Sequence, residues 1–234
     1  MKRHIPNALT CGNLICGCIG IIEAFHNNLL LSCALIGVAA IFDFFDGFVA
    51  RLLNVSSPIG KELDSLADMT TFGVLPSIII YQLLMESIPD LTGIWKAYLA
   101  IFIAVFSALR LAKFNIDPRQ SDQFIGVPTP ANAMLVASLP FIVRFHEDTW
   151  RPIIVNTTTL LIFTAVMSYL LVAEIPLFAL KFKSFGWKGN EVRFSFLILS
   201  LALLLGLGIL AIPLIVAIYV LLSLALMLMN NSKS

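Results

Sequence analysis

The amino-acid sequence predicts an all-α protein, a polytopic bundle of membrane-spanning helices. Hydrophobic residues make up 59% of the 234 residues, charged residues make up only 12%, and the mean hydropathy is +0.94. Soluble domains average about 45–50% apolar and about 25% charged residues. Several apolar runs reach the roughly 20 residues that one transmembrane helix needs. Because no stretch is polar enough to fold separately, we expect residues 1–234 to form a single integral membrane domain.

Eight segments are candidates for membrane spans. They are residues 9–26, 30–50, 68–86, 94–113, 130–145, 155–175, 193–208 and 212–229. The last two come from one apolar stretch of roughly 37 residues, which as a single helix would be about 55 Å long, against a hydrocarbon core of about 30 Å. Gly206, Gly208 and Pro213 interrupt this stretch. We therefore expect a C-terminal helical hairpin over residues 192–229.

The distribution of cations predicts the orientation in the membrane. With the N-terminus in the cytoplasm, only three of the 15 Lys and Arg residues fall in outer segments: Lys96, Arg144 and Arg151. The other twelve fall in cytoplasmic segments, as the positive-inside rule requires; they are Lys2, Arg3, Arg51, Lys61, Arg110, Lys113, Arg119, Lys181, Lys183, Lys188, Arg193 and Lys233. We expect an integral protein of a bacterial inner membrane, surrounded by the lipid bilayer, with its active site facing the cytoplasm. The net charge of +1 gives no indication of a nucleic-acid partner, and none is expected.

Four aspartates are the most informative residues: Asp43, Asp46, Asp64 and Asp68. On helices the first two stand at i, i+3 and the last two at i, i+4, so each pair shares one face. A short polar connection, residues 54–58, lets the two helices run antiparallel and brings the pairs together near the cytoplasmic side. Ionisable groups inside a membrane are costly and usually mark function. The four carboxylates predict a site for two hard divalent cations, Mg²⁺ or Mn²⁺, which can clamp a phosphoryl displacement.

Small and cationic residues accompany the aspartates. Gly47, Ala50 and Gly60 each lie one turn from an aspartate, where they leave room for a nucleotide. Arg51 and Lys61 lie beside the cluster, and their side chains suit a diphosphate. A solvated acidic loop is the alternative. It explains the first aspartate pair poorly, because that pair follows an unbroken apolar run.

The segment from Asp43 to Asp68 reads Asp-x2-Asp-Gly-x2-Ala-Arg-x8-Gly-x3-Asp-x3-Asp. It resembles the signature of the CDP-alcohol phosphatidyltransferase family at every fixed position. The resemblance implies a six-helix membrane core, commonly a homodimer, in which the aspartates hold two divalent metals. Such enzymes move a phosphoalcohol from a CDP-alcohol to an acceptor hydroxyl and release CMP. It also implies that Asp43, Asp46 and Asp64 are metal ligands, and that Asp68 contacts the metal site and acts as the general base. The resemblance covers most of residues 1–185, the expected catalytic core.

Asn7, Thr10 and Asn13 stand three residues apart on one stripe of the first predicted helix. From spacing alone, a polar helix start explains them as well as a binding site does. The family resemblance implies that they line the nucleotide and diphosphate pocket.

Two later segments resemble the phosphatidylserine synthases of this family. They are residues 108–115, Ala-Leu-Arg-Leu-Ala-Lys-Phe-Asn, and residues 126–133, Gly-Val-Pro-Thr-Pro-Ala-Asn-Ala. Thr129 and Asn132 depart from the closest form of the second segment, Gly-Leu-Pro-Ser-Pro-Ala-Ala-Ala. The resemblance implies CDP-diacylglycerol and L-serine as the substrates.

The carboxylate of L-serine needs a cation near the metal site. Arg110 and Lys113 are the candidates, and ordinary positive-inside anchoring is the alternative for both. Two rival functions also remain at this point. One is a transferase of the same family that uses glycerol 3-phosphate or inositol as the acceptor. The other is a cation-coupled transporter, which the sequence favours less because it has no visible internal repeat and its aspartates lie away from the midplane.

Overall fold

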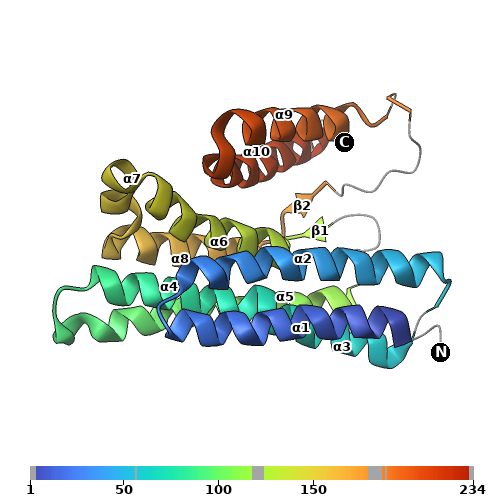
Figure 1. The fold of residues 1–234 in the computed structure, drawn as a ribbon. Coiled ribbons are helices and arrows are strands. Elements are labelled where there is room, and N and C mark those ends of the chain that lie inside the picture. The colour runs from blue at the N-terminus through green and yellow to red at the C-terminus, as the bar shows by residue number, and fades with distance from the viewer. Residues whose placement is uncertain (1–3, 56, 118–123, 179–185, 188, 232–234) are drawn as a thin grey trace.

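The computed structural model describes residues 4–55, 57–117, 124–178, 186–187 and 189–231 (Figure 1). In these ranges the elements are α1 (His4–Phe25), α2 (Leu29–Leu52), α3 (Pro58–Asp68), η1 (Met69–Val74), α4 (Leu75–Ser87), η2 (Leu91–Ala100), α5 (Ile101–Ile116), β1 (Phe124–Ile125), α6 (Thr129–Phe145), α7 (Glu147–Ile154), α8 (Thr157–Val172), β2 (Pro176–Leu177), α9 (Glu191–Leu207), η4 (Gly208–Leu210) and α10 (Ala211–Asn231). The predicted all-α membrane bundle is confirmed, with one short strand pair added. Seven of the cations used to predict the orientation lie outside the described ranges: Lys2, Arg3, Arg119, Lys181, Lys183, Lys188 and Lys233.

A tight connection reverses the chain between the two acidic helices. Helix α2 ends at Leu52, and Asn54 follows with a positive φ of 49°, a conformation that Asn tolerates better than most residues. Ser57 then caps α3, because its Oγ accepts a hydrogen bond from the Gly60 amide at 3.0 Å. Pro58 occupies the first turn, where its missing amide hydrogen costs nothing. Local sequence therefore turns α3 back toward the end of α2.

Helix α1 packs along α2 and also against α3 and η1 (Figure 1). It thus lies against both acidic helices and supplies one wall of the space between them. The polar residues Asn7, Thr10 and Asn13, which the family resemblance assigned to the pocket, all belong to this helix.

The third membrane segment begins earlier than predicted. Instead of a span that starts at residue 68, one continuous helical stretch of 30 residues runs from Pro58 to Ser87. The stretch stays continuous because Met69–Val74 forms a π-helical turn between α3 and α4. Such turns are rare and are frequently found at functional sites. Here the π-helical turn follows Asp68 directly.

Five helical stretches are long and apolar enough to cross a membrane, by length and composition within the described residues. They are His4–Phe25, Leu29–Leu52, Pro58–Ser87, Thr92–Ile116 and Glu191–Met229. The number rises to six if α7 and α8, bent by 67°, count as one span. Each of the eight predicted segments is mainly helical, but the sixth, 155–175, extends beyond α8 at both ends, and α6 has only 17 residues. Helices α9 and α10 divide the 39-residue stretch at Gly208, which has a positive φ of 56°, and Figure 1 shows them side by side as a hairpin.

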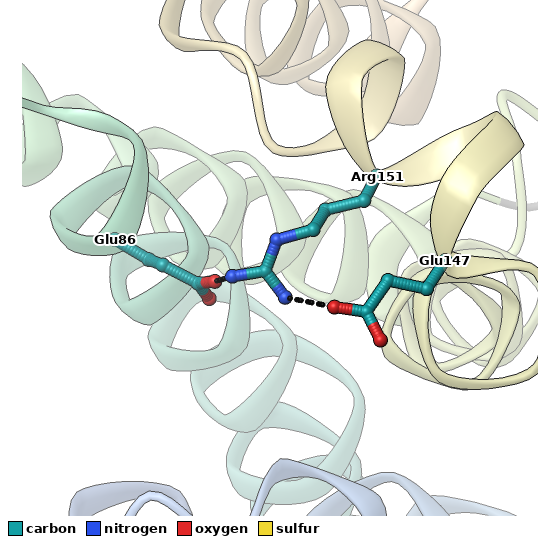
Figure 2. Close-up of polar contacts among 3 residues, drawn as sticks. All are labelled: Glu86, Glu147 and Arg151. Atoms are coloured by element: carbon teal, nitrogen blue, oxygen red, sulfur yellow. Dashed lines mark hydrogen bonds and ion pairs between the residues drawn. The ribbon is translucent and has the colours of Figure 1, made fainter.

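Charged side chains connect α4 to α7 at the end of the bundle away from the acidic helix ends (Figure 2). Arg151 donates to the carboxylate of Glu86 through Nη2 and to that of Glu147 through Nη1, the latter at 3.2 Å. All three side chains are exposed, with side-chain exposures between 41% and 57%. Because exposed ion pairs contribute little, we treat this cluster as a link between helix ends and not as a major source of stability.

A short antiparallel pair joins β1 and β2, with Phe124 opposite Leu177 and Ile125 opposite Pro176. The pairing continues beyond the strands, since the Gly126 amide donates to the Ile175 carbonyl oxygen at 3.1 Å, and the Val127 amide then donates to the Leu170 carbonyl oxygen of α8 at 2.9 Å. Gly126 allows this close approach: its φ is +75°, and a Cβ there would lie 2.4 Å from a carbonyl oxygen of α8. The pair leads the chain directly into α6.

Candidate active site

The predicted site residues surround a pocket of about 280 Å³ between α1, α2 and α3. Its lining residues are Pro6, Asn7, Thr10, Asp46, Gly47, Ala50, Val55, Ser57, Gly60, Lys61 and Asp64. Eight of these were predicted from sequence; the exceptions are Pro6, Val55 and Ser57. Three distant parts of the first 64 residues therefore meet at one cavity, as a binding site requires.

Three carboxylates converge beside this pocket, and one of them, Asp64, lines it. Each of Asp43, Asp64 and Asp68 offers an oxygen that lies within 4.8 Å of the oxygens offered by the other two. All three residues are half-buried, in α2 and α3, which both pack against α1. Three acidic groups this close repel one another strongly unless a cation lies between them. The donor set consists only of carboxylate oxygens, the ligands that hard divalent cations prefer, so this cluster can bind such a metal.

Asp46, the fourth predicted ligand, has a different immediate partner. Its side chain is 7% exposed, and its Oδ2 accepts a hydrogen bond from the Thr10 hydroxyl at 2.7 Å. The same hydroxyl lies 3.1 Å from the carbonyl oxygen of Pro6. Asp46 lines the pocket but is not part of the group of three carboxylates. The structure therefore brings three of the four aspartates together and places the fourth on the adjoining wall.

Asn13 joins α1 to the end of α3. Its side chain is buried, and its Nδ2 donates to Asp68 Oδ1 at 3.2 Å. Its carbonyl oxygen accepts a hydrogen bond from the Thr71 hydroxyl, in the π-helical turn, at 3.1 Å. Gly17, one turn further along α1, permits this contact, because a Cβ there would lie 2.2 Å from Thr71 Oγ1. The close packing of α1 on η1 fixes the position of Asp68.

The glycines of the signature shape the pocket in different ways. A Cβ on Gly60 would lie 3.0 Å from Asn7 Oδ1 and 2.9 Å from Ser57 Oγ, so α1 and α3 approach each other here. A Cβ on Gly47 would meet only Arg51 Nη1, at 3.7 Å. Gly60 thus serves close packing, whereas Gly47 leaves open space in the wall of the cavity.

The two predicted diphosphate cations lie at the mouth of the pocket. Lys61 lines it, and its Nζ donates to the Asn115 carbonyl oxygen at 3.1 Å. Arg51 is exposed and does not line the cavity, although Nη1 comes within 3.7 Å of the Cβ position of Gly47. Lys61 is therefore held in place by α5, while Arg51 lies at the rim.

Arg110 and Lys113, the predicted acceptor cations, differ sharply in burial. Arg110 is 5% exposed, whereas Lys113 is exposed. The Arg110 Nη1 donates to Thr129 Oγ1 at 3.3 Å, and its guanidinium carbon lies 5.7 Å from the centre of the Phe114 ring. Arg110 also lies close enough to Asp68 for the two charges to interact. A buried cation beside the acidic cluster compensates part of its charge.

Several buried polar atoms near this acceptor side have no hydrogen-bond partner in the part of the chain that the structure describes. They are Asn13 Oδ1, Ser107 Oγ, Arg110 Nε and both amide atoms of Asn132. Ser107 precedes Arg110 by one turn on α5, and Asn132 follows Thr129 by one turn on α6. Because buried polar groups normally have partners, these atoms suit a small polar ligand.

Sequence reasoning missed three residues that the structure places at or beside the site. Ser57 precedes Pro58, a recognisable helix-start signal that could have identified it. Thr71 lies in an apolar segment with no pattern around it. Tyr219 of α10 donates to the Phe178 carbonyl oxygen at 2.9 Å, beside β2, and no local sequence signal indicates this contact.

Known proteins resemble this chain over most of its length. A family model described as CDP-alcohol phosphatidyltransferase matches residues 3–187. The chain is 38% identical over 173 residues to the CDP-diacylglycerol–serine O-phosphatidyltransferase of Bacillus subtilis, covering 74% of this chain and 89% of that protein. Proteins of the same name from Helicobacter pylori and Mycobacterium leprae are 41% and 34% identical, over 56% and 74% of this chain but only 54% and 57% of their own lengths. Because these matches extend far beyond the aspartate signature, the chain belongs to the CDP-alcohol phosphatidyltransferase family.

Proposed function

We propose that this protein transfers the phosphatidyl group of CDP-diacylglycerol to the hydroxyl of L-serine, giving phosphatidylserine and CMP. The observation that carries the proposal is the convergence of Asp43, Asp64 and Asp68 within 4.8 Å, beside a pocket bounded by the other signature residues. The names of the relatives support serine as the acceptor, with 38% identity over 74% of the chain in the Bacillus subtilis protein.

CDP-diacylglycerol occupies the pocket between α1, α2 and α3 in this proposal. Its binding residues are Asn7, Thr10, Asn13, Gly47, Ala50, Arg51, Gly60 and Lys61. Supporting this, all of them except Asn13 and Arg51 line the cavity. Amide and hydroxyl groups from α1 suit the cytidine and ribose, while the cations at the mouth suit the diphosphate.

Asp43, Asp46, Asp64 and Asp68 are the proposed ligands of two divalent cations, Mg²⁺ or Mn²⁺. When bound, these ions would neutralise the carboxylates and withdraw negative charge from the diphosphate. The all-oxygen donor set and the mutual proximity of three of the carboxylates support the assignment.

Asp68 is the proposed general base. As the serine hydroxyl oxygen attacks the lipid-side phosphorus, its proton passes to the Asp68 carboxylate. The bond between that phosphorus and the bridging oxygen of the diphosphate breaks, and CMP leaves with the electron pair. Asn13, which donates to Asp68 Oδ1 at 3.2 Å, orients the carboxylate. A positioned base of this kind contributes about 10²–10⁴-fold to a rate.

Arg110 is the proposed partner of the serine carboxylate. It is buried, interacts with Asp68, and retains a guanidinium nitrogen, Nε, without a partner among the described residues. Lys113 is exposed, and its proposed role is to attract anionic substrates electrostatically without contacting the serine carboxylate.

The protein is an integral membrane protein, and we further propose a bacterial inner membrane with the active site on the cytoplasmic side. In this arrangement residues 1–185 form the catalytic core of a homodimer, and residues 192–229 form an added hairpin. The test of orientation is labelling of single cysteines introduced at the two ends of the bundle in intact cells. Chemical cross-linking in the membrane tests the dimer.

The proposed reaction is tested with the purified full-length protein in lipid–detergent micelles. CMP release is measured with CDP-diacylglycerol and Mg²⁺ or Mn²⁺, in parallel reactions with L-serine, glycerol 3-phosphate, inositol or no acceptor. We expect CMP and phosphatidylserine with L-serine and only background CMP otherwise. Faster release with another acceptor would contradict the serine assignment. Cation flux across proteoliposomes without CMP production would instead favour a transporter.

A further inference from the structure

Tyr219, on the C-terminal hairpin, packs beside the β1–β2 pair, where its hydroxyl donates a hydrogen bond to the Phe178 carbonyl oxygen. We propose that Tyr219 is a positioning residue for serine binding, which holds the β1–β2 pair and Arg110 in the geometry that the acceptor requires. This inference rests on the proposed function, and it assigns the hairpin a part in acceptor recognition beyond anchoring in the membrane.

Tyr219 is fixed to the segment that follows β2 by two kinds of contact. Its hydroxyl donates to the carbonyl oxygen of Phe178 at 2.9 Å. Its ring meets the Phe178 ring edge to face, with the centroids 4.9 Å apart. Phe196 of α9 completes an aromatic trio, at 5.6 Å from each of the other two rings. Both helices of the hairpin therefore contact Phe178 through aromatic rings, in arrangements that aromatic pairs prefer.

A short series of contacts connects Phe178 to Arg110. Phe178 directly follows β2, which pairs with β1. After β1 the chain passes through Val127, which is 1% exposed, to Thr129 at the start of α6. Thr129 is the residue whose hydroxyl accepts from Arg110 at 3.3 Å. A shift of the segment after β2 would thus reach the partner of Arg110.

Apolar packing at the same place supports a specific role for α10. A second apolar cluster consists of Val127, Leu135, Met167 and Leu177, and Val216, Tyr219 and Val220 of α10 pack against it. In Figure 1 the hairpin lies alongside the β1–β2 pair and α6, and the contacts agree. Most of the hairpin is uncovered, since only 6% of its most apolar window is buried. It is attached at two places: beside the β1–β2 pair through Tyr219 and its neighbours, and at its turn, where Ile209 and Leu210 pack against the main core.

The hairpin also lies beyond residues 3–187, the part of the chain that the family model matches. The contacts of Tyr219 are consequently additional to the shared family core. A simple membrane anchor would not need a hydrogen bond to Phe178. Anchoring is nevertheless the competing explanation, and it predicts a different experimental result.

The test is a kinetic comparison of full-length Tyr219→Phe with the unaltered protein in lipid–detergent micelles. The substitution removes one hydroxyl and keeps the ring, so folding should be preserved. Loss of one hydrogen bond should raise KM for L-serine about fivefold. The KM for CDP-diacylglycerol and kcat should stay unchanged, while the unfolding temperature should fall by no more than about 2–4 °C. Tyr169→Phe is the matched control, because Tyr169 lies on α8 with its side chain 66% exposed, and it should leave both KM values unchanged.

Four outcomes would overturn the inference. An unchanged KM for L-serine in Tyr219→Phe would make the tyrosine irrelevant to the acceptor. Equal increases in the KM values of both substrates, or a lower unfolding temperature with unchanged KM values, would indicate a purely structural anchor. If the unaltered protein released no CMP in response to L-serine, the proposed function itself would fail and this inference with it. That failure is recognised from the unaltered protein alone, before any variant is compared.

Discussion

Gly17→Ala tests whether close packing of α1 on the π-helical turn holds the site together. The added methyl would lie 2.2 Å from Thr71 Oγ1 and 3.1 Å from Thr71 Cα, so rotation of the threonine alone cannot remove the clash. Overpacking of this kind costs about 1–3 kcal/mol. Displacing the Thr71 hydroxyl from the Asn13 carbonyl costs about 1 kcal/mol more. The higher helix propensity of Ala returns about 0.5–1 kcal/mol, which leaves a net destabilisation of about 2 kcal/mol.

The assay is thermal unfolding followed by tryptophan fluorescence in detergent, combined with CMP release at a temperature where the protein is folded. A loss of about 2 kcal/mol lowers the unfolding temperature by about 4–8 °C in a chain of this size. Gly37→Ala is the matched control on α2, because nothing lies within 4 Å of its added Cβ. It should leave the unfolding temperature unchanged or raise it.

A second variant separates the clash from a general effect of the substitution. Thr71→Ala removes the hydroxyl that the new methyl meets, so the double variant Gly17→Ala/Thr71→Ala should be more stable than the sum of the single effects predicts. Activity should follow, because Asn13 adjoins this contact and orients Asp68. If Gly17→Ala unfolds at the same temperature as Gly37→Ala, the packing argument for Asp68 is refuted.

Three further changes test the proposed chemistry. Asp68→Asn keeps the size of the side chain but removes the base, so kcat should fall by about 10²–10⁴-fold; full CMP release from this variant would exclude Asp68. Gly60→Ala places a methyl 3.0 Å from Asn7 Oδ1 and should raise KM for CDP-diacylglycerol while sparing KM for L-serine; equal effects on both would count against the assigned pocket. Removal of divalent cations with EDTA should abolish CMP release, and Mg²⁺ or Mn²⁺ should restore it; activity that survives the chelator would contradict the metal requirement.

The aspartate site was largely predictable because helical spacing determines which residues share a face. Asp43, Asp64 and Asp68 converge as the i, i+3 and i, i+4 spacings indicated. Spacing does not determine hydrogen-bond partners, however. The contact of Asp46 with Thr10 depends on the position of α1, which only tertiary packing fixes. The start of the third membrane segment was missed for a similar reason, since hydropathy marks the apolar part of a helix and not its polar first turns.

The acceptor side could be predicted only in part. Arg110 and Lys113 are three residues apart on one helix, so their positions in the sequence make them nearly equivalent. Their burial differs because α5 turns Arg110 toward Thr129 and Asp68 while Lys113 remains exposed. That rotation of the helix depends on neighbours distant in sequence, which a single sequence does not specify.

For the hairpin, too, the sequence alone does not specify which face of each helix packs against the protein. Helices α9 and α10 are apolar on every side, so periodicity cannot indicate which face packs against the protein and which meets lipid. Chain geometry indicated the turn near Gly208, since a single helix would be too long for the bilayer. The direction of Tyr219 is decided instead by a polar atom: in a membrane its hydroxyl needs a partner, and the Phe178 carbonyl provides one at 2.9 Å. Tyr219 and Ser223, one turn apart and each hydrogen-bonded, thus mark the packed face of α10, and this face lies against the cluster that contains Val127 and Leu177.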